Sequence, residues 1–69
     1  SNPPPWQNWP LGVRVVIRRR LPDGGFSDVI GNILYYDDDV ALLETRTGQV
    51  RVSAAETAAA KRVGPPRRV

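Results

Sequence analysis

The 69-residue chain contains no cysteine and no histidine. This absence excludes disulfide bonds, zinc sites built from Cys or His, thiol nucleophiles, and catalytic triads that need a histidine. A chain of this length buries only about 60% of the surface that it exposes when unfolded, so its stability is marginal. Without a covalent or metal crosslink, the sequence must build one economical hydrophobic core, which favours a small barrel or bundle.

Alternating apolar residues predict that the core is built from β-strands. Val13, Val15 and Ile17 share one face of a strand over residues 13–20, and the other face carries arginines. A second strand is expected over residues 27–36, where Gly31 marks a bend that lets one strand serve both halves of a barrel. Strands are also expected over residues 40–45 and 49–52, joined by a tight turn in which Gly48 adopts a positive φ.

The pattern changes after the fourth expected strand. Ser53 and Glu56 have the spacing of a capping box, and the alanine-rich residues 54–60 favour a helix. The stretch predicts a helical segment of about two turns, or partly a 3₁₀ turn, which would not be stable alone. A short last strand over residues 61–63 then returns to the first strand.

These elements predict an all-β fold, a small SH3-like five-stranded barrel with a short helical or 3₁₀ turn before the last strand. Closing the barrel removes open sheet edges. The competing fold is an oligonucleotide-binding barrel, which places its helix between strands three and four, whereas here the helix follows strand four. The predicted core is apolar throughout, with Trp9 or Tyr35 closing one end; its members are Val13, Val15, Ile17, Val29, Ile33, Leu42, Val50 and Val52.

The chain divides by composition into three parts. Residues 1–10 form a Pro/Trp-rich N-terminal arm, residues 11–64 the barrel, and residues 65–69 a basic Pro/Arg linker. Residues 3–5 are consecutive prolines and predict extended, polyproline-like chain. Trp6 and Trp9 are costly to expose to water, so we expect them to hold the arm against the barrel. The alternative is that they form stacking or docking surfaces.

Four segments resemble a known family: GVRVVIRRRL (12–21), DVIGNIL (28–34), GQVRV (48–52) and AAKRV (59–63). In this order and spacing they are similar to the SH3-like N-terminal domain of a group of actinobacterial GNAT-family N-acetyltransferases. The resemblance covers about four-fifths of the chain, and the Pro/Arg-rich end is similar to the linker that precedes the catalytic domain in that group.

The resemblance implies that this chain is the non-catalytic N-terminal accessory domain of an acetyltransferase that uses acetyl-CoA. Its partner would be the C-terminal acetyltransferase domain of the same chain, on which it would dock or to which it would present a protein substrate. Family members bind acetyl-CoA with an Arg/Gln-x-x-Gly-x-Gly/Ala loop. None of the six glycines here has Arg or Gln three residues before it. We therefore expect no catalytic or cofactor-binding residue in this chain. The absence of Cys and His and the unsuitable aspartate run predict no metal-binding residue. The lack of cysteines fits a cytoplasmic location, and no apolar run approaches the roughly 18 residues of a membrane span, so we expect no membrane partner.

Charge supports an alternative function, a small basic SH3-like barrel that binds nucleic acid. The chain has 10 Lys and Arg against 7 Asp and Glu, for a net charge of +3. Because alternate strand residues share a face, Arg18 and Arg20 point together and Arg19 points away. The candidate binding surface combines phosphate contacts with a stacking aromatic; its members are Arg14, Arg18, Arg20, Arg51, Tyr36 and Trp6. The competing interpretation of residues 18–20 is a solvated strand end.

The remaining polar and aromatic clusters predict structural roles. Residues 37–39 are three adjacent aspartates, which suit a turn better than the alternating ligands of a calcium loop. Tyr35 and Tyr36 are neighbours on a strand, so they should point to opposite faces and cannot form one aromatic cage. Glu56 is expected to be occupied by the cap, and Glu44 to pair with Arg51 across two strands.

Overall fold

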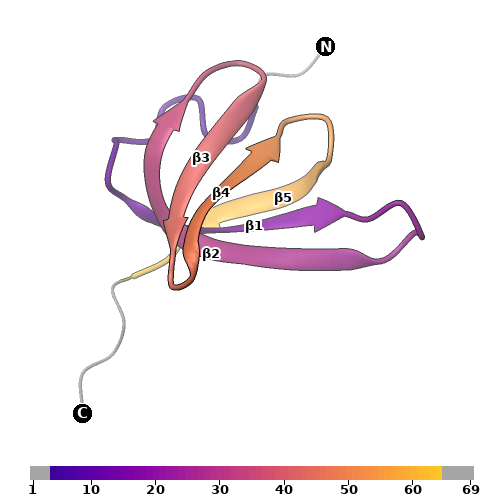
Figure 1. The fold of residues 1–69 in the computed structure, drawn as a ribbon. Coiled ribbons are helices and arrows are strands. Elements are labelled where there is room, and N and C mark those ends of the chain that lie inside the picture. Colours follow the sequence, from indigo (N-terminus) through magenta and orange to yellow (C-terminus); the bar gives the residue numbers. More distant parts are fainter. Residues whose placement is uncertain (1–3, 65–69) are drawn as a thin grey trace.

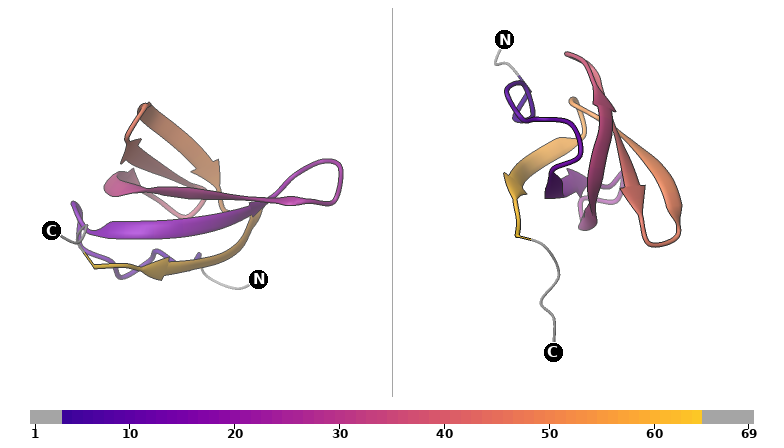
Figure 2. Two further views of the ribbon diagram at one scale, coloured as in Figure 1. Left: turned by 90° about the horizontal axis from the view of Figure 1, so that it is seen from below. Right: turned by 90° about the vertical axis from the view of Figure 1, so that its left-hand side faces the viewer.

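The computed structural model describes residues 4–64, which form five antiparallel strands in one sheet. The strands are β1 (Arg14–Arg20), β2 (Phe26–Tyr36), β3 (Val40–Thr45), β4 (Gly48–Ser53) and β5 (Thr57–Arg62), in the spatial order β4-β3-β2-β1-β5 (Figure 1). The sheet curls strongly into a barrel-like shape, seen best from below and from the side (Figure 2). The predicted all-β, five-stranded fold is confirmed, and residues 4–64 contain no helix.

β2 is the long strand that both halves of the sheet share. Its residues 26–32 pair with β1 and its residues 32–36 pair with β3. Gly31 lies beside this changeover, and a Cβ placed there would collide with the backbone carbonyl of Glu44. Glycine is required here because β3 crosses so close to the β2 backbone, and the register of β2 with β3 then shifts between Ile33 and Tyr35.

Eight side chains form the buried core: Trp6, Val15, Ile17, Val29, Ile33, Ala41, Leu43 and Val52. Five of them, on β1, β2 and β4, were predicted from the alternation. Predicted members Val13 and Val50 are partly buried and pack against the core. Trp9 packs there too, whereas Tyr35 is half exposed, so Trp9 rather than Tyr35 closes the core.

The prediction that Leu42 belongs to the core is wrong. Ala41, Leu42 and Leu43 are consecutive and all apolar, so the sequence does not show which of them face the core. Pairing with β4 decides it, because Ala41 lies opposite buried Val52 and Leu43 lies opposite Val50. Leu42 therefore points outward and is only partly buried.

The described part of the N-terminal arm packs against the barrel, as predicted. Trp6 is completely buried, and its indole Nε1 donates a 2.8 Å hydrogen bond to the carbonyl oxygen of Asp37. The hydroxyl of Tyr36 lies 2.7 Å from the carbonyl oxygen of Trp9, to which it donates. Residues 1–3 and 65–69 lie outside the described residues, so the linker and the three domain boundaries stay predictions. The polyproline prediction is wrong at Pro5, which begins a turn over residues 5–8 in which the Gln7 N–H donates to the carbonyl oxygen of Pro4 at 3.3 Å.

The predicted helical stretch over residues 54–60 is wrong. Residues 54–56 form a turn, and β5 begins at Thr57, well before the strand expected at residues 61–63. An isolated helix of two turns is marginal in water, whereas β5 pairs with β1 over most of its length, with one register shift between Arg18 and Arg19. Ala60 also packs against the core. Tertiary pairing therefore overrides the helix propensity of the alanines.

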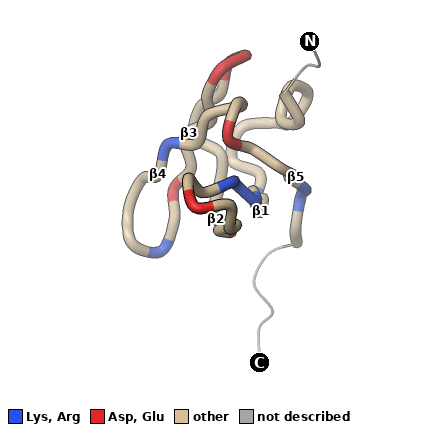
Figure 3. The backbone as a smooth tube through the Cα atoms, turned by 90° about the vertical axis from the view of Figure 1, so that its right-hand side faces the viewer, with Lys and Arg blue, Asp and Glu red and all other residues tan. Residues whose placement is uncertain are grey.

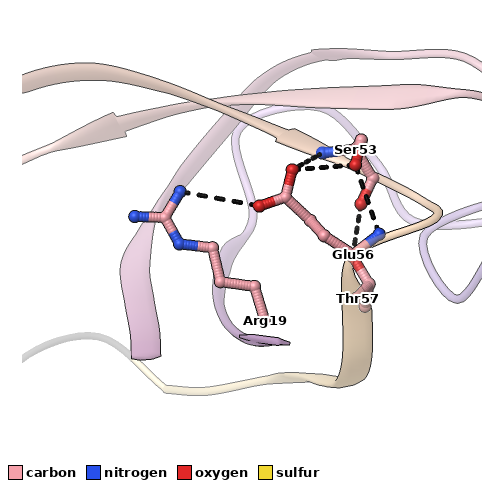
Figure 4. Close-up of polar contacts among 4 residues, drawn as sticks. All are labelled: Arg19, Ser53, Glu56 and Thr57. Atoms are coloured by element: carbon pink, nitrogen blue, oxygen red, sulfur yellow. Dashed lines mark hydrogen bonds and ion pairs between the residues drawn. The ribbon is translucent and has the colours of Figure 1, made fainter. Parts of the chain in front are cut away.

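The predicted capping-box contacts do form, around a turn instead of a helix (Figure 4). Ser53 Oγ accepts a 3.2 Å hydrogen bond from the N–H of Glu56. In return, Glu56 Oε2 accepts from the hydroxyl of Ser53 at 2.8 Å and from its N–H at 3.1 Å. These bonds lower the pKa of Glu56, with a further small contribution from Arg19. The prediction that the cap occupies Glu56 is confirmed.

Two other turns match the sequence predictions. Arg46 and Thr47 connect β3 to β4, and Gly48 follows them with a φ of +126°. At the β2–β3 turn, Asp37 Oδ1 accepts hydrogen bonds from the N–H of Asp39 at 2.8 Å and of Val40 at 2.9 Å. These bonds lower the pKa of Asp37 and keep it charged. The aspartate run is therefore a turn, as predicted.

Candidate functional site

The outer face of β1, β2 and β5 brings together three of the arginines that the sequence singled out. Arg14, Arg18 and Arg20 alternate along β1 with buried Val15 and Ile17, so all three point outward. Within residues 4–64, the cations are nevertheless distributed over β1, β5, β4 and the β3–β4 hairpin rather than gathered in one stripe (Figure 3).

Arg18 is engaged by a carboxylate on the neighbouring strand. Its Nε donates to Asp28 Oδ1 at 2.9 Å and its Nη2 donates to Asp28 Oδ2 at 3.3 Å. The hydrogen bond and the attraction between the charges raise the pKa of Arg18, and the hydrogen bond chiefly lowers the pKa of Asp28. The guanidinium carbon also lies 6.0 Å from the ring centroid of Phe26. Arg18 therefore has a carboxylate partner on β2, in an ion pair that stays exposed to solvent.

Arg14 and Arg20 donate to backbone carbonyls on the β5 side of β1. Arg14 Nη1 lies 3.0 Å from the carbonyl oxygen of Gly64, and Arg20 Nη1 lies 3.1 Å from that of Thr57. Lys61 faces the same side because it lies opposite outward-facing Val16. Lys61 is absent from the predicted surface because a helix was expected over residues 54–60. The pairing of β5 with β1 therefore could not be predicted.

Arg51 does not belong to this face. It lies on β4, and both β3 and β2 separate that strand from β1 in the sheet. Its charge acts instead on Asp37, as the smallest of the influences that lower the pKa of that carboxylate. The predicted Glu44–Arg51 pair is also wrong, because the register places Glu44 opposite Gln49 and Arg51 opposite Leu42.

The two aromatic residues predicted to stack on nucleic acid are not available as exposed platforms. Trp6 is in the core, and Tyr36 is partly buried with its hydroxyl hydrogen-bonded to the arm. Tyr35 points to the opposite, exposed side, as its position next to Tyr36 predicted. The aromatic side chain that does stand on the outer face is Phe26, which is 58% exposed. The position of Phe26 beside the arginines of β1 depends on the β1–β2 register, which the sequence alone did not predict.

An apolar strip, interrupted by the polar side chains of Asp28 and Asn32, lies along the outer face of β2. It consists of Phe26, Ile30 and Leu34, which are 58%, 47% and 40% exposed. Val16 on β1 lies directly opposite Ile30 and widens the strip. Beside it, a shallow groove crosses from β2 over β1 to β5; its lining is Val16, Arg18, Asp28, Ala59, Ala60 and Lys61. This arrangement offers an apolar contact area with a charged margin.

The described residues offer neither a metal cluster nor a helical membrane span. Among residues 4–64, no three acidic side chains gather where they could hold a metal ion. In the same range there is no helix with the length and apolarity needed to cross a bilayer.

Comparison with known proteins identifies the family. Neither the curated proteins nor the solved structures contain a match to the chain. A family model described as the Rv0428c N-terminal Sm-like domain matches residues 9–61. That range runs from Trp9, in the arm, to Lys61, near the end of β5, and so includes almost the whole curled sheet. The chain therefore belongs to the Rv0428c N-terminal Sm-like domain family.

Proposed function

We propose that this chain is a non-catalytic interaction module that docks on a folded partner domain through the outer face of β1, β2 and β5. The apolar strip carries this proposal. Exposed apolar side chains that gather on one face of a small domain mark interaction sites more often than isolated ones do. Phe26, Ile30 and Leu34 occupy every second outward position of β2, with Asp28 and Asn32 between them, and Val16 on β1 lies beside Ile30.

The partner that we propose is the catalytic domain of a GNAT-family N-acetyltransferase in the same polypeptide, which would use acetyl-CoA. The resemblance of the four sequence segments supports this partner. The matching family is described as an N-terminal domain, which fits a partner domain in the same polypeptide but does not specify its activity. The role of this chain would be to dock on that domain or to present a protein substrate to it.

Nucleic-acid binding is the second candidate, favoured by the shared face of Arg14, Arg18 and Arg20 beside Phe26. The arginine contacts weaken it. Arg18 is already paired with Asp28 through two hydrogen bonds, and the two other guanidiniums donate to backbone carbonyls. A phosphate would have to compete with the carboxylate of Asp28 for Arg18, and this carboxylate would repel it.

One spectroscopic experiment separates the two candidates. A ¹⁵N-labelled chain is titrated with mixed-sequence DNA and RNA at two salt concentrations. Docking through the apolar strip predicts no shifts at physiological salt. Shifts confined to residues 18–20 that weaken as salt rises would support nucleic-acid binding instead, and Arg18→Glu with Arg20→Glu should then abolish them.

The docking proposal is tested directly by the coding sequence after Val69 and by a binding measurement. An Arg/Gln-x-x-Gly-x-Gly/Ala motif downstream supports the acetyltransferase partner, and a stop codon contradicts it. If an acetyltransferase domain is encoded downstream, that domain is expressed separately and titrated into the labelled chain. Phe26→Ser with Ile30→Ser should weaken the complex at least tenfold. Leu11→Ser is the matched control, because Leu11 is 65% exposed but lies outside the strip.

A further inference from the structure

The first half of β2 has one edge that no other strand covers. β1 pairs with residues 26–32 of β2, whereas pairing with β3 begins only at Asn32. On the β3 side, the backbone of residues 26–30 therefore has no strand partner within the described chain. Such an edge presents a row of backbone donors and acceptors to any extended segment that approaches it.

The hydrogen-bond pattern identifies the groups that face outward from this edge. Ile33 N–H donates to Val13 and its carbonyl accepts from Gly12, so Ile33 directs both backbone groups toward the N-terminal side of β1. Backbone direction alternates along a strand. The backbone N–H and C=O groups of Val29 and Gly31 therefore also point toward β1. Those of Asp28 and Ile30 point to the uncovered side.

A groove lies along the same edge. It has a volume of about 470 Å³ and runs between β2 and the tip of the β3–β4 hairpin; its lining is Arg19, Ser27, Asp28, Val29, Ile30, Thr45, Arg46, Thr47 and Val50. Figure 1 shows this hairpin tip returning beside β2. The groove is thus bounded by the free backbone of β2 on one side and by a hairpin with two threonines on the other.

The charge in the groove is positive. Arg19 and Arg46 line it, and Asp28, the carboxylate among its described lining residues, is already paired with Arg18. Arg19 is only loosely balanced, because Glu56 Oε1 lies 3.9 Å from its Nη1 (Figure 4). Its Nε is buried and has no hydrogen-bond partner among the described residues. The groove is therefore complementary to a negatively charged segment.

We propose that an extended acidic peptide segment binds in this groove by adding a strand to the free edge of β2. Its backbone pairs with Asp28 and Ile30, which is the mode of β-strand addition. Its inward side chains contact Val29 and Val50, and its carboxylates lie near Arg19 and Arg46. The groove shares Ile30 with the apolar strip but follows the β3-side edge of β2 rather than its outer face, and the proposal does not rest on the docking function.

The test uses the labelled chain and a short blocked peptide of sequence VTETVTE, whose valines and glutamates share one face of an extended strand, the face that meets Val29, Val50 and the two arginines. We expect amide shifts confined to residues 27–30 and 45–47, with slower hydrogen exchange at Asp28 and Ile30 on binding. A peptide with lysine in place of glutamate, and one N-methylated on the edge that faces β2, should each bind at least tenfold more weakly. No shifts at millimolar peptide, or equal binding of the N-methylated peptide, would overturn the proposal.

Protein variants complete the test. Arg46→Glu should weaken binding of the acidic peptide at least tenfold, because it reverses a charge at the groove. Arg51→Glu is the matched control, since it makes the same charge change at a residue of β4 that does not line the groove and points to the opposite face from Val50, and it should leave binding unchanged. Ile30→Pro removes the outward N–H, and if it unfolds the chain, the N-methylated peptide still tests the same bond. Equal losses for the two charge variants would show a non-specific charge effect and refute the site.

Discussion

Trp6 is tied to Asp37 across 31 positions of sequence by the hydrogen bond from its indole nitrogen to the Asp37 carbonyl oxygen. The indole is completely buried in the same place. One residue near the start of the chain therefore supplies the largest core side chain and also fixes the turn between β2 and β3. The N-terminal arm is part of the packed domain, at least from residue 4 onward.

We predict that Trp6→Ala destabilises the domain by about 3–5 kcal/mol, the usual cost of removing a buried large aromatic side chain. For a domain of this size, that loss leaves much of the population unfolded. Chemical denaturation followed by circular dichroism measures the change. Leu11→Ala is the control and should change stability by no more than about 0.5 kcal/mol, because Leu11 is largely exposed. Comparable losses for the two variants would contradict the role of Trp6.

Gly31→Ala should cost about 1–3 kcal/mol through overpacking. The added methyl group meets the backbone carbonyl of Glu44, which cannot rotate away as a side chain could. Thermal unfolding gives the comparison, with Gly64→Ala as control because a Cβ at Gly64 meets nothing within 4 Å. A neutral Gly31→Ala would mean that β3 does not cross β2 so closely.

Ser53→Ala should cost about 0.5–2 kcal/mol. It removes the hydroxyl that both donates to Glu56 Oε2 and accepts from the Glu56 N–H. The control is Ser27→Ala, since the Ser27 hydroxyl makes no hydrogen bond within the described residues. Urea denaturation of the two variants should separate them, and equal midpoints would argue against the Ser53–Glu56 contact.

Glu56 should make stability depend on pH in the acidic range. Its pKa in the folded chain lies below the ordinary value of 4.5, chiefly because Ser53 donates to the carboxylate. A carboxyl group with a lowered pKa stabilises the fold above its unfolded pKa, and this contribution disappears as pH falls through the folded pKa. Glu56→Gln should therefore lose stability relative to the native chain at pH 7, and the difference should shrink below about pH 4. A difference that stays constant from pH 7 to pH 3 would refute this origin.

Ala59→Thr should stabilise the domain by up to about 1 kcal/mol, because threonine favours a strand more than alanine does. Ala59 is exposed on β5 opposite Arg18, so a larger side chain has room. Ala55→Thr, in the preceding turn, should bring no such gain. If residues 54–60 were helical, Ala59→Thr would destabilise instead, which makes the sign of the change decisive.

Period-two alternation was sufficient to predict most of the sheet. It identified β1 and β3 closely and placed Arg14, Arg18 and Arg20 on one face. It failed where the pattern is ambiguous, as at Ala41, Leu42 and Leu43, and where local propensity disagrees with tertiary pairing, as in β5. Phe26 and Lys61 were not assigned to the candidate site because only the register of β1 with its two neighbours brings them to Arg18 and Val16.

The turn lengths have a consequence for the order in which this domain assembles. β1 through β4 are joined by connections of only a few residues, so their pairings close short loops. The contacts of the two ends are much longer in range, since Trp6 reaches Asp37 and Thr57 of β5 pairs with Arg19. Closing long loops costs more entropy. The four-stranded meander should therefore form first. Trp6 and the alanine-rich β5 should pack against it in the last step of folding.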